Sequence, residues 1–331
     1  LDIIFSSFIG QLQVADSFLF FSDSRFCWVF VFDTNGRLLD KKLGQGRGPN
    51  EIPVKSIDAF SFLPDGTKIV LGSTSDYYLI NENWELDVKS IFDINYNNTA
   101  REDPENPATY TFDYENLFLQ SDSKGHIFIP VYGETERFNP FSRRYYLEGR
   151  ILLKVDYRHN KIKEVMGRRS PRYLDYKYLG HHAFFHYDID NSDNFYISHE
   201  IDSLIYVYDH TFRPVKALGF KGKDMNTDYK ELSTLDIKQF RNLYFNDRPK
   251  RGYYTWVKYF DEKNILFRSY KKNLDTPFDG LQIYRNDTLI ADVAVPKNFN
   301  VVGYIKPYFY TNARIDEMNE KIKAFRFELK L

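Results

Sequence analysis

The sequence offers almost no sulfur chemistry. It contains one cysteine, Cys27, and only three methionines in 331 residues. A single cysteine excludes an intramolecular disulfide and a zinc site built from several thiolates. Because Cys27 lies within the apolar run 26–32, we expect a small buried side chain there.

An excess of positive charge is also missing. The 45 Lys and Arg residues nearly balance the 46 Asp and Glu residues, which gives a formal net charge of -1. Non-specific nucleic-acid binding needs a basic field, so nucleic acid is not an expected partner.

Long hydrophobic runs are absent. No apolar run approaches the roughly 20 residues that cross a bilayer. Residues 1–5 contain neither the positive region nor the cleavage site of a signal peptide, and they begin with Leu1 rather than Met. We therefore expect a mature or trimmed chain whose export signal has already been removed.

Recognisable catalytic and cofactor motifs are missing too. There is no Gly-x-Ser-x-Gly elbow for a nucleophilic serine. Gly44-Gln45-Gly46 is not a dinucleotide fingerprint, because we expect neither a helix after it nor a βαβ unit around it. No cofactor and no catalytic residue are predicted.

Aromatic residues are what the sequence has in abundance. They make up 18% of the chain, with 30 Phe and 26 Tyr. Aromatic side chains suit the pleated, half-buried surface of a sheet. The recurring unit is a short alternating or apolar run, a tight polar turn, and another such run. Asn35-Gly36 is one such turn, since this pair supplies the positive φ angles of a hairpin.

This pattern predicts an all-β, six-bladed β-propeller of four-stranded antiparallel blades. The blades are predicted to begin near Leu12, Ile57, Leu117, Ala183, Tyr254 and Asn300. The last blade supplies three strands, so we expect residues 2–8 to pair beside residues 323–331 and close the ring. Closure removes the unpaired edge of an open array. Two alternatives stay open: a pair of β-sandwiches, and a seventh blade hidden in an insertion.

Irregular spacing of the blades indicates insertions in a single domain that spans residues 1–331. The insertions are predicted at about 97–116, 133–148, 168–182 and 221–253. The last is predicted to be partly helical over residues 228–244, because Leu232, Leu235, Phe240 and Leu243 share one face at helical spacing. Its simplest role is to cover a blade.

Residues 43–52, Leu-Gly-Gln-Gly-Arg-Gly-Pro-Asn-Glu-Ile, resemble the Gly-x-Gly-Pro-x-Glu connector of six-bladed propellers from Bacteroides-type bacteria. Those proteins belong to the wider NHL- and TolB-like group. Asn50 departs from the pattern, which often has Gly there. The glycines allow positive φ and close backbone approach, and Pro49 stiffens the exit.

The resemblance implies a location rather than an activity, since most such proteins lack a known one. It implies a secreted or lipid-anchored protein in the periplasm or at the cell surface. A lipoprotein's anchoring cysteine would lie upstream of Leu1, and the membrane would be contacted only through that anchor.

Two groups of residues are candidate sites. The first could bind an anionic ligand such as an acidic glycan, because guanidinium groups bind carboxylates and aromatic faces stack on sugars. It consists of Arg143, Arg144, Arg168, Arg169, Arg172 and Tyr173. The alternative is a solvated basic face paired with Glu134, Glu136 and Glu148.

The second candidate is a metal pair, His182 and His186. On a strand the two imidazoles would face the same side, with His199 or Glu200 as a third ligand. The alternative is a structural role. Residues 188–194 resemble a calcium loop in the spacing of their oxygen ligands, but Asp and Asn are also favoured as turn formers, which is the simpler interpretation.

We expect a non-enzymatic binding or interaction module of the cell envelope, because varied insertions on a rigid scaffold are where binding residues gather. Its partner is expected to be a small molecule, a glycan or an envelope protein. Tyr145-Tyr146 and the tyrosines of 173–178 suit a contact surface, or merely pack the insertions.

The alternative function is a propeller hydrolase or lyase acting on carbohydrate or a lactone. A metal-bound carboxylate–histidine group at the channel mouth would favour the enzyme, and a channel plugged by Phe and Tyr would favour binding.

Overall fold

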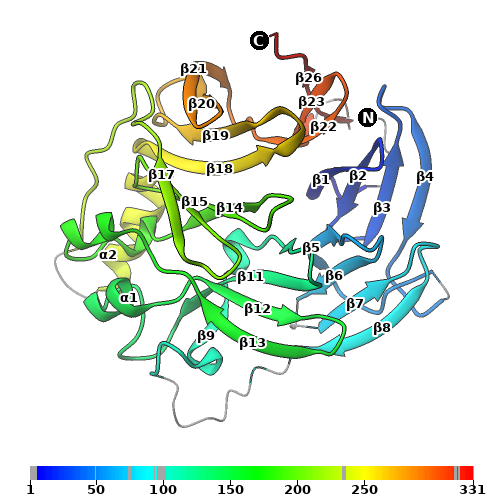
Figure 1. Cartoon of the computed structure of the whole chain (residues 1–331), viewed down its shortest axis with the longest axis horizontal. Helices are drawn as coiled ribbons and strands as arrows, with labels where there is room; N and C mark the ends of the chain where they lie inside the picture. The colour runs from blue at the N-terminus through cyan, green and yellow to red at the C-terminus, as the bar shows by residue number, and fades with distance from the viewer. Residues whose placement is uncertain are drawn as a thin grey trace.

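Neighbouring strands pair in chain order to form six antiparallel sheets around a common centre (Figure 1). The computed structural model describes residues 6–330 except 49, 74–75, 93, 95–101, 233–235, 317–318 and 320. The prediction of an all-β, six-bladed propeller is therefore confirmed.

Each of the first three blades runs from an innermost strand to an outermost one. The first blade contains β1 (Gly10–Ala15), β2 (Phe18–Asp23), β3 (Trp28–Phe32) and β4 (Leu38–Leu43). The second contains β5 (Ile57–Phe62), β6 (Lys68–Gly72), β7 (Asp76–Ile80) and β8 (Leu86–Ile91). The third contains β10 (Gln120–Ser121), β11 (His126–Gly133), β12 (Leu152–Asp156) and β13 (Lys161–Met166), with β9 (Tyr110–Phe112) paired to β11.

The other three blades follow the same order. The fourth contains β14 (Phe185–Ile189), β15 (Phe195–His199), β16 (Ile205–Tyr208) and β17 (Pro214–Leu218). The fifth contains β18 (Tyr253–Phe260), β19 (Ile265–Lys271), β20 (Phe278–Arg285) and β21 (Thr288–Pro296). In the described residues the sixth contains β22 (Val301–Ile305), β23 (Tyr308–Thr311) and β26 (Arg326–Phe327), with a hairpin of β24 (Arg314–Asp316) and β25 (Lys321–Lys323) between the last two.

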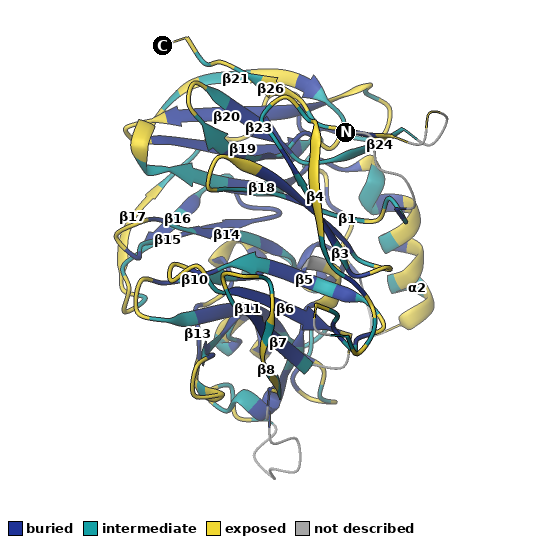
Figure 2. Cartoon of the chain, turned by 90° about the vertical axis from the view of Figure 1, so that its right-hand side faces the viewer, coloured by how far each residue is buried: buried dark blue, intermediate teal, exposed yellow. Residues whose placement is uncertain are grey.

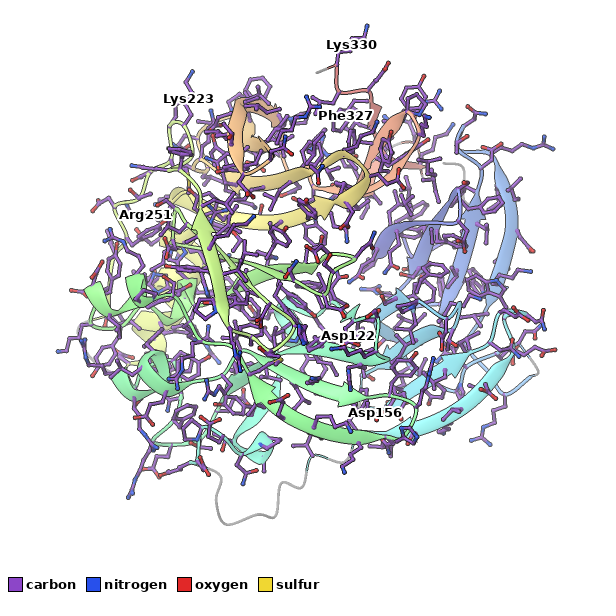
Figure 3. All side chains as sticks on the ribbon, viewed as in Figure 1. Asp122, Asp156, Lys223, Arg251, Phe327 and Lys330 are labelled. Carbon is purple, nitrogen blue, oxygen red and sulfur yellow. The ribbon has the colours of Figure 1, made fainter. Side chains whose placement is uncertain are left out.

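Burial decreases from the middle of a blade to its outer edge. β6, with the apolar run Ile69-Val70-Leu71, is buried throughout, whereas β8 alternates between intermediate and exposed residues. Strands covered on both faces read as continuous apolar runs, and half-exposed strands alternate. In blade three the strands follow one another from the centre outward. Figure 3 shows this order, with Asp122 beside β10 nearer the centre than Asp156 on β12.

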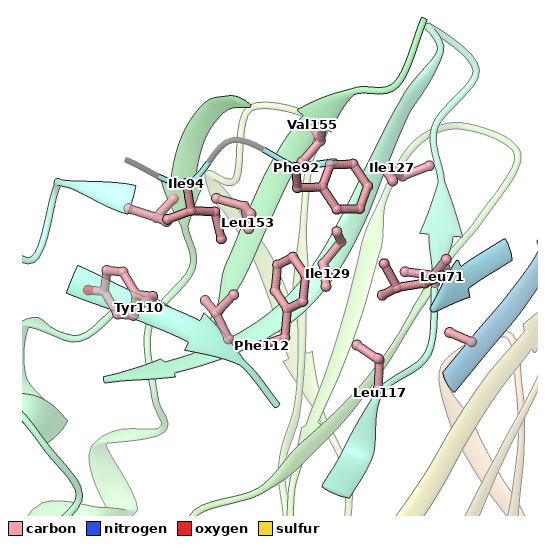
Figure 4. Close-up of a cluster of buried hydrophobic side chains, with 14 of the residues drawn as sticks. Leu71, Phe92, Ile94, Tyr110, Phe112, Leu117, Ile127, Ile129, Leu153 and Val155 are labelled. Atoms are coloured by element: carbon pink, nitrogen blue, oxygen red, sulfur yellow. The ribbon is translucent and has the colours of Figure 1, made fainter. Parts of the chain in front are cut away.

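The largest hydrophobic cluster of the described residues begins between blades two and three (Figure 4) and continues into the insertions through residues such as Phe138 and Tyr145. Leu71, Phe112, Ile129 and Leu153 each expose at most 1% of their surface. Tyr77 and Phe92 stack there with ring centroids 4.2 Å apart. Burying one such side chain contributes about 1.5–3 kcal/mol, so this contact between blades stabilises the ring.

All four predicted insertions emerge on one face of the ring. In an antiparallel blade, the connection from the second to the third strand and the connection to the next blade leave from the same side. Residues 133–148 form a connection of the first kind, and 97–116, 168–182 and 221–253 lie in connections of the second kind. We call this side the insertion face. Figure 2 shows α2 (Ile237–Asn242) and β24 on it together.

Short helices occupy these insertions. They are α1 (Arg143–Glu148), α2, a π-helical turn Leu243–Asp247, and 3-10 helices at Pro107–Thr109, Tyr114–Asn116, Pro171–Asp175, Gly180–His182 and Arg248–Lys250. One more 3-10 helix, Asp261–Lys263, lies in the turn between β18 and β19. In the described residues, none of the helices has the length and apolar character needed to span a bilayer.

The helix predicted over residues 228–244 is shorter than its periodicity indicated. Asp236 begins α2, because its carboxylate accepts the backbone N–H of Lys238 at 2.8 Å. Leu232 is buried before the helix, and its N–H donates to the carbonyl of Tyr178 at 2.9 Å. Leu235 lies outside the described residues.

The predicted ring closure is only partly described. Residues 1–5 lie outside the described residues, while Ser6 and Ser7 donate hydrogen bonds to the buried Asp23 carboxylate at 2.6–2.7 Å. The prediction of one strand over 323–331 is wrong, because Lys323 ends the β24–β25 hairpin and only Arg326–Phe327 pairs with β23. The first and last blades contact through β1 and β22.

The connector at residues 43–52 confirms the expected use of glycine. Glu51 folds back so that its carboxylate accepts the N–H of Gly48 at 2.8 Å. A Cβ atom at Gly46 would overlap this carboxylate. Gly44 has a φ of 154° and sits against Trp28. Pro49, expected to stiffen the exit, lies outside the described residues.

Candidate ligand-binding site

A cavity of about 680 Å³ opens on the insertion face beside blades three and four. Its walls come from residues 113–115, 132–145, 180–184 and 237–245, together with Arg169. Segments from four connections therefore meet at one place, although they are far apart in the sequence.

Aromatic rings form a large part of the cavity wall. Phe141 meets Phe240 edge to face with centroids 5.2 Å apart, and Tyr244 lies 6.1 Å from Phe240. Phe245 and Tyr114 expose 67% and 45% of their surface at the cavity. Large exposed aromatic groups that line a concavity are typical of binding surfaces.

Two tyrosines fix two carboxylates at the cavity. The hydroxyl of Tyr244 donates to Glu115 Oε2 at 2.5 Å, and the hydroxyl of Tyr132 donates to Glu134. Burial and the neighbouring carboxylate raise the pKa of both tyrosines, so both remain protonated donors. The remaining carboxylate lone pairs are available as acceptors.

Arg169 provides a buried positive charge at the cavity. Its side chain is 6% exposed, and its guanidinium carbon lies 4.3 Å from the centroid of the Tyr145 ring. The guanidinium donates to the carbonyl of Ala183 and to the hydroxyl of Tyr145. Burial raises the pKa of Tyr145 to about 12.

A second polar cluster lies behind the cavity wall. Glu200, 2% exposed, accepts a hydrogen bond from Arg248, whose guanidinium lies 4.1 Å from the Tyr253 ring centroid. Burial alone would raise the pKa of Glu200, but the pKa is lowered, and the charge of Arg248 is the largest cause that opposes burial. His182 Nδ1 lies 3.4 Å from Glu200 Oε2, within ion-pair distance but not in hydrogen-bonding geometry.

Four histidines in this region carry depressed pKa values because they are buried. Burial lowers the pKa of His181 and of His199 to about 3, and that of His186 to about 4. Burial also lowers the pKa of His182, although Glu200 acts in the opposite direction. All four are therefore neutral at physiological pH.

The geometry assumed for the metal pair is wrong. His182 lies in a 3-10 helix, and the strand β14 begins only at Phe185, so His182 and His186 do not share a strand face. In the part of the chain that the structure describes, no three His, Cys, Asp or Glu side chains converge as metal ligands. The pair stays a prediction.

The predicted arginine group does not converge either. Among its members Arg169 lines the cavity, whereas Arg144 pairs with Glu148 at 2.8 Å, as the solvated alternative predicted. Arg143 and Arg168 donate to the backbone carbonyls of Leu174 and Leu147, and Arg172 pairs with Asp175. Tyr173 is 1% exposed and donates to the carbonyl of His182. It packs the insertion, as do the buried Tyr145 and Tyr146.

Residues 190–194 form the turn that joins β14 to β15, as the simpler interpretation predicted, while Asp188 lies on β14. The Asp190 carboxylate accepts the backbone N–H groups of Ser192 and Asn194 at 2.9 and 2.8 Å. Asp193 instead accepts hydrogen bonds from Ser123 in the neighbouring blade.

Aromatic side chains from three blades meet at the innermost strands. Phe118 lies 5.8 Å from Trp256 and 6.3 Å from His186, between ring centroids. Trp256 also donates to the carbonyl of Val301 on β22. The sequence did not indicate this contact, because its members become neighbours only when the blades close around the centre.

The cavity residues Asp113, Glu115, Tyr132, Glu134 and Tyr244 were also missed. Their available signal was indirect: all five lie in or beside the predicted insertions. Nothing in the local sequence indicates which carboxylate meets which tyrosine.

Comparisons with known proteins support the fold. The chain is similar to a DUF4221-family protein from Bacteroides vulgatus, with a TM-score of 0.68 and 13% identity over 97% of this chain and 93% of that one. It is also similar to a Bacteroides fragilis protein described as exported, with a TM-score of 0.57 and 13% identity over 94% and 80% of the two chains. No protein-family model and no curated protein matches the sequence.

Proposed function

We propose that this chain is a binding module that receives a small polyhydroxylated ligand, such as a glycan fragment, in the cavity on the insertion face. The observation that carries the proposal is the composition of the cavity wall: eight of its nineteen lining residues are aromatic. Its volume of about 680 Å³ falls within the range of small-molecule sites, roughly 300–1,000 Å³.

The polar groups fit a ligand rich in hydroxyl groups. Glu115 and Glu134 are held by tyrosine hydroxyls and still have acceptor positions for ligand O–H groups. Rings such as Phe245 offer flat apolar faces against which a sugar ring can stack. The wall thus combines stacking surfaces with oriented acceptors.

A place in the cell envelope is part of the proposal. The connector at residues 43–52 and the similarity to an exported Bacteroides fragilis protein support export of this chain. A lipid anchor and residence in the periplasm or at the cell surface stay predictions.

The alternative is a hydrolase or lyase acting on carbohydrate or a lactone, and one observation favours it: the Tyr145 hydroxyl lies beside Arg169 within the cavity wall. A tyrosinate there would be a candidate general base. Burial raises the pKa of Tyr145 to about 12, so the phenol is protonated at neutral pH. An efficient general base needs a pKa near the working pH, which Tyr145 does not have. We therefore prefer binding.

The experiment is calorimetric titration of the full chain with a library of mono- and disaccharides. Phe245→Ala should weaken binding about three- to tenfold, because it removes one stacking face. Phe278→Ala is the matched control, since Phe278 is 51% exposed on β20 and does not line the cavity. Equal losses in both variants, or no binding of any member, would refute the proposal. Mass spectrometry of the incubated sugars detects turnover, which would establish the alternative.

A further inference from the structure

We infer that the cavity selects saccharides that carry a carboxylate, with Arg169 as the group that receives it. This inference rests on the proposed function and names its ligand class: hexuronic acids and their glycosides. It depends on the partners of one buried guanidinium group.

Arg169 is a buried cation whose partners are neutral. Its contacts are the carbonyl of Ala183 and the hydroxyl and ring of Tyr145. No ion pair of the described residues includes Arg169, and its Nε–H group has no hydrogen-bond partner there. Taking a charge out of water is costly unless it is paired, so the site is incomplete without an anion.

The other buried arginines are completed within the protein. Arg251 forms two hydrogen bonds of 2.8 and 2.9 Å to the Asp247 carboxylate. Arg268, wholly buried, donates to Ser198 and to three backbone carbonyls. Neither residue lines the cavity. Arg169 differs from these two arginines in two ways. Its protein acceptors neither carry a negative charge nor occupy its Nε–H group, and it lines the cavity.

The acidic side chains of the cavity narrow the ligand class further. Asp113, Glu115 and Glu134 line the same wall, so a ligand that is only an anion would meet three like charges. A uronic acid resolves this conflict because it presents one carboxylate for Arg169 and several hydroxyl donors for the fixed carboxylates. A guanidinium group offers five donors, two of which are used by the protein contacts of Arg169.

The test compares three ligands that differ at one group: methyl glucuronide, its methyl ester and methyl glucoside. Calorimetric titration of the unaltered chain should show the acid binding roughly ten- to hundredfold more tightly than the ester and the glucoside. Because the comparison uses the unaltered chain, misfolding of a variant cannot explain the result.

Variants then assign the preference to one residue. Arg169→Met should abolish the difference between acid and ester, and Arg169→Lys should retain part of it. Arg285→Met is the matched control, since Arg285 is exposed at the end of β20, does not line the cavity and should leave the difference intact.

Equal affinities for the acid and its ester would overturn the inference and leave the binding function standing. Failure of both the glucuronide and a galacturonide to bind would also overturn it. The proposed function would fail separately, if no member of the wider saccharide library bound.

Discussion

His199 is a buried histidine whose replacement by phenylalanine should change how stability depends on pH. The side chain is wholly buried, with the rings of Phe185, Tyr173 and Tyr206 at centroid distances of 5.9, 6.0 and 6.1 Å. Neither ring nitrogen has a hydrogen-bond partner in the described structure. Burial and then the charge of Arg169 lower its pKa to about 3, while Asp202 opposes them.

The sign of the effect follows from the two protonation states. The unfolded chain binds a proton at His199 below a pKa of about 6.5, and the folded chain does so only near 3. Protonation therefore stabilises the unfolded state as the pH falls through 6.5, and the free energy of unfolding decreases. Between pH 7 and pH 5 this loss is about 2 kcal/mol for one histidine.

Urea unfolding at pH 7 and pH 5 measures this loss. His199→Phe should raise the free energy of unfolding, relative to the parent, by about 2 kcal/mol more at pH 5 than at pH 7. His210→Phe, at an exposed turn position, is the control and should leave the pH dependence unchanged. If His199→Phe and the parent lose stability in parallel, His199 either is accessible to protons or is paired in the folded state, and the reasoning is wrong.

Three further predictions concern single side chains. Arg268→Met should lower the free energy of unfolding in urea by roughly 3 kcal/mol or more, because Ser198 and the carbonyls of residues 202–204 lose their buried donor; an unchanged midpoint would contradict this. Burial and Asp23 raise the pKa of Cys27 to about 11, so only about one thiol in a thousand is ionised at pH 8, and a thiol reagent should label it only after unfolding. Gly303→Ala would force a methyl group onto Val14 between the last and first blades, and should lower the free energy of unfolding by about 1–3 kcal/mol; Val14→Gly in the same chain should recover part of the loss in a thermal melt.

The strands could be predicted because their signals are local. The apolar run beginning at Ile265 forms β19, and the predicted turn at Asn35-Gly36 joins β3 to β4, although only Gly36 of the pair has a positive φ.

The site could not be predicted in the same way, because its members meet only through the ring. Arg169 was proposed as a ligand-binding residue alongside five neighbours, yet only tertiary packing turns it toward the cavity and turns Tyr173 inward. Helical spacing overestimated the length of the helix around α2. Periodicity cannot show that the N–H of Leu232 donates a hydrogen bond to the carbonyl of Tyr178 instead of forming a helical hydrogen bond. The strand-face argument for His182 failed because β14 begins at Phe185.

The one-sidedness of the molecule has a practical consequence. The side opposite the cavity carries tight turns such as Asn286-Asp287, which joins β20 to β21 with φ angles of 47° and 66°. A fluorophore or a surface linker attached there would leave the opening unobstructed. Conversely, loop-closure entropy grows slowly with length, so a foreign segment could be inserted at the exposed Glu136-Arg137 while the buried Phe138 and Tyr145 keep their packing. The ring would then serve as a fixed frame for engineered receptors.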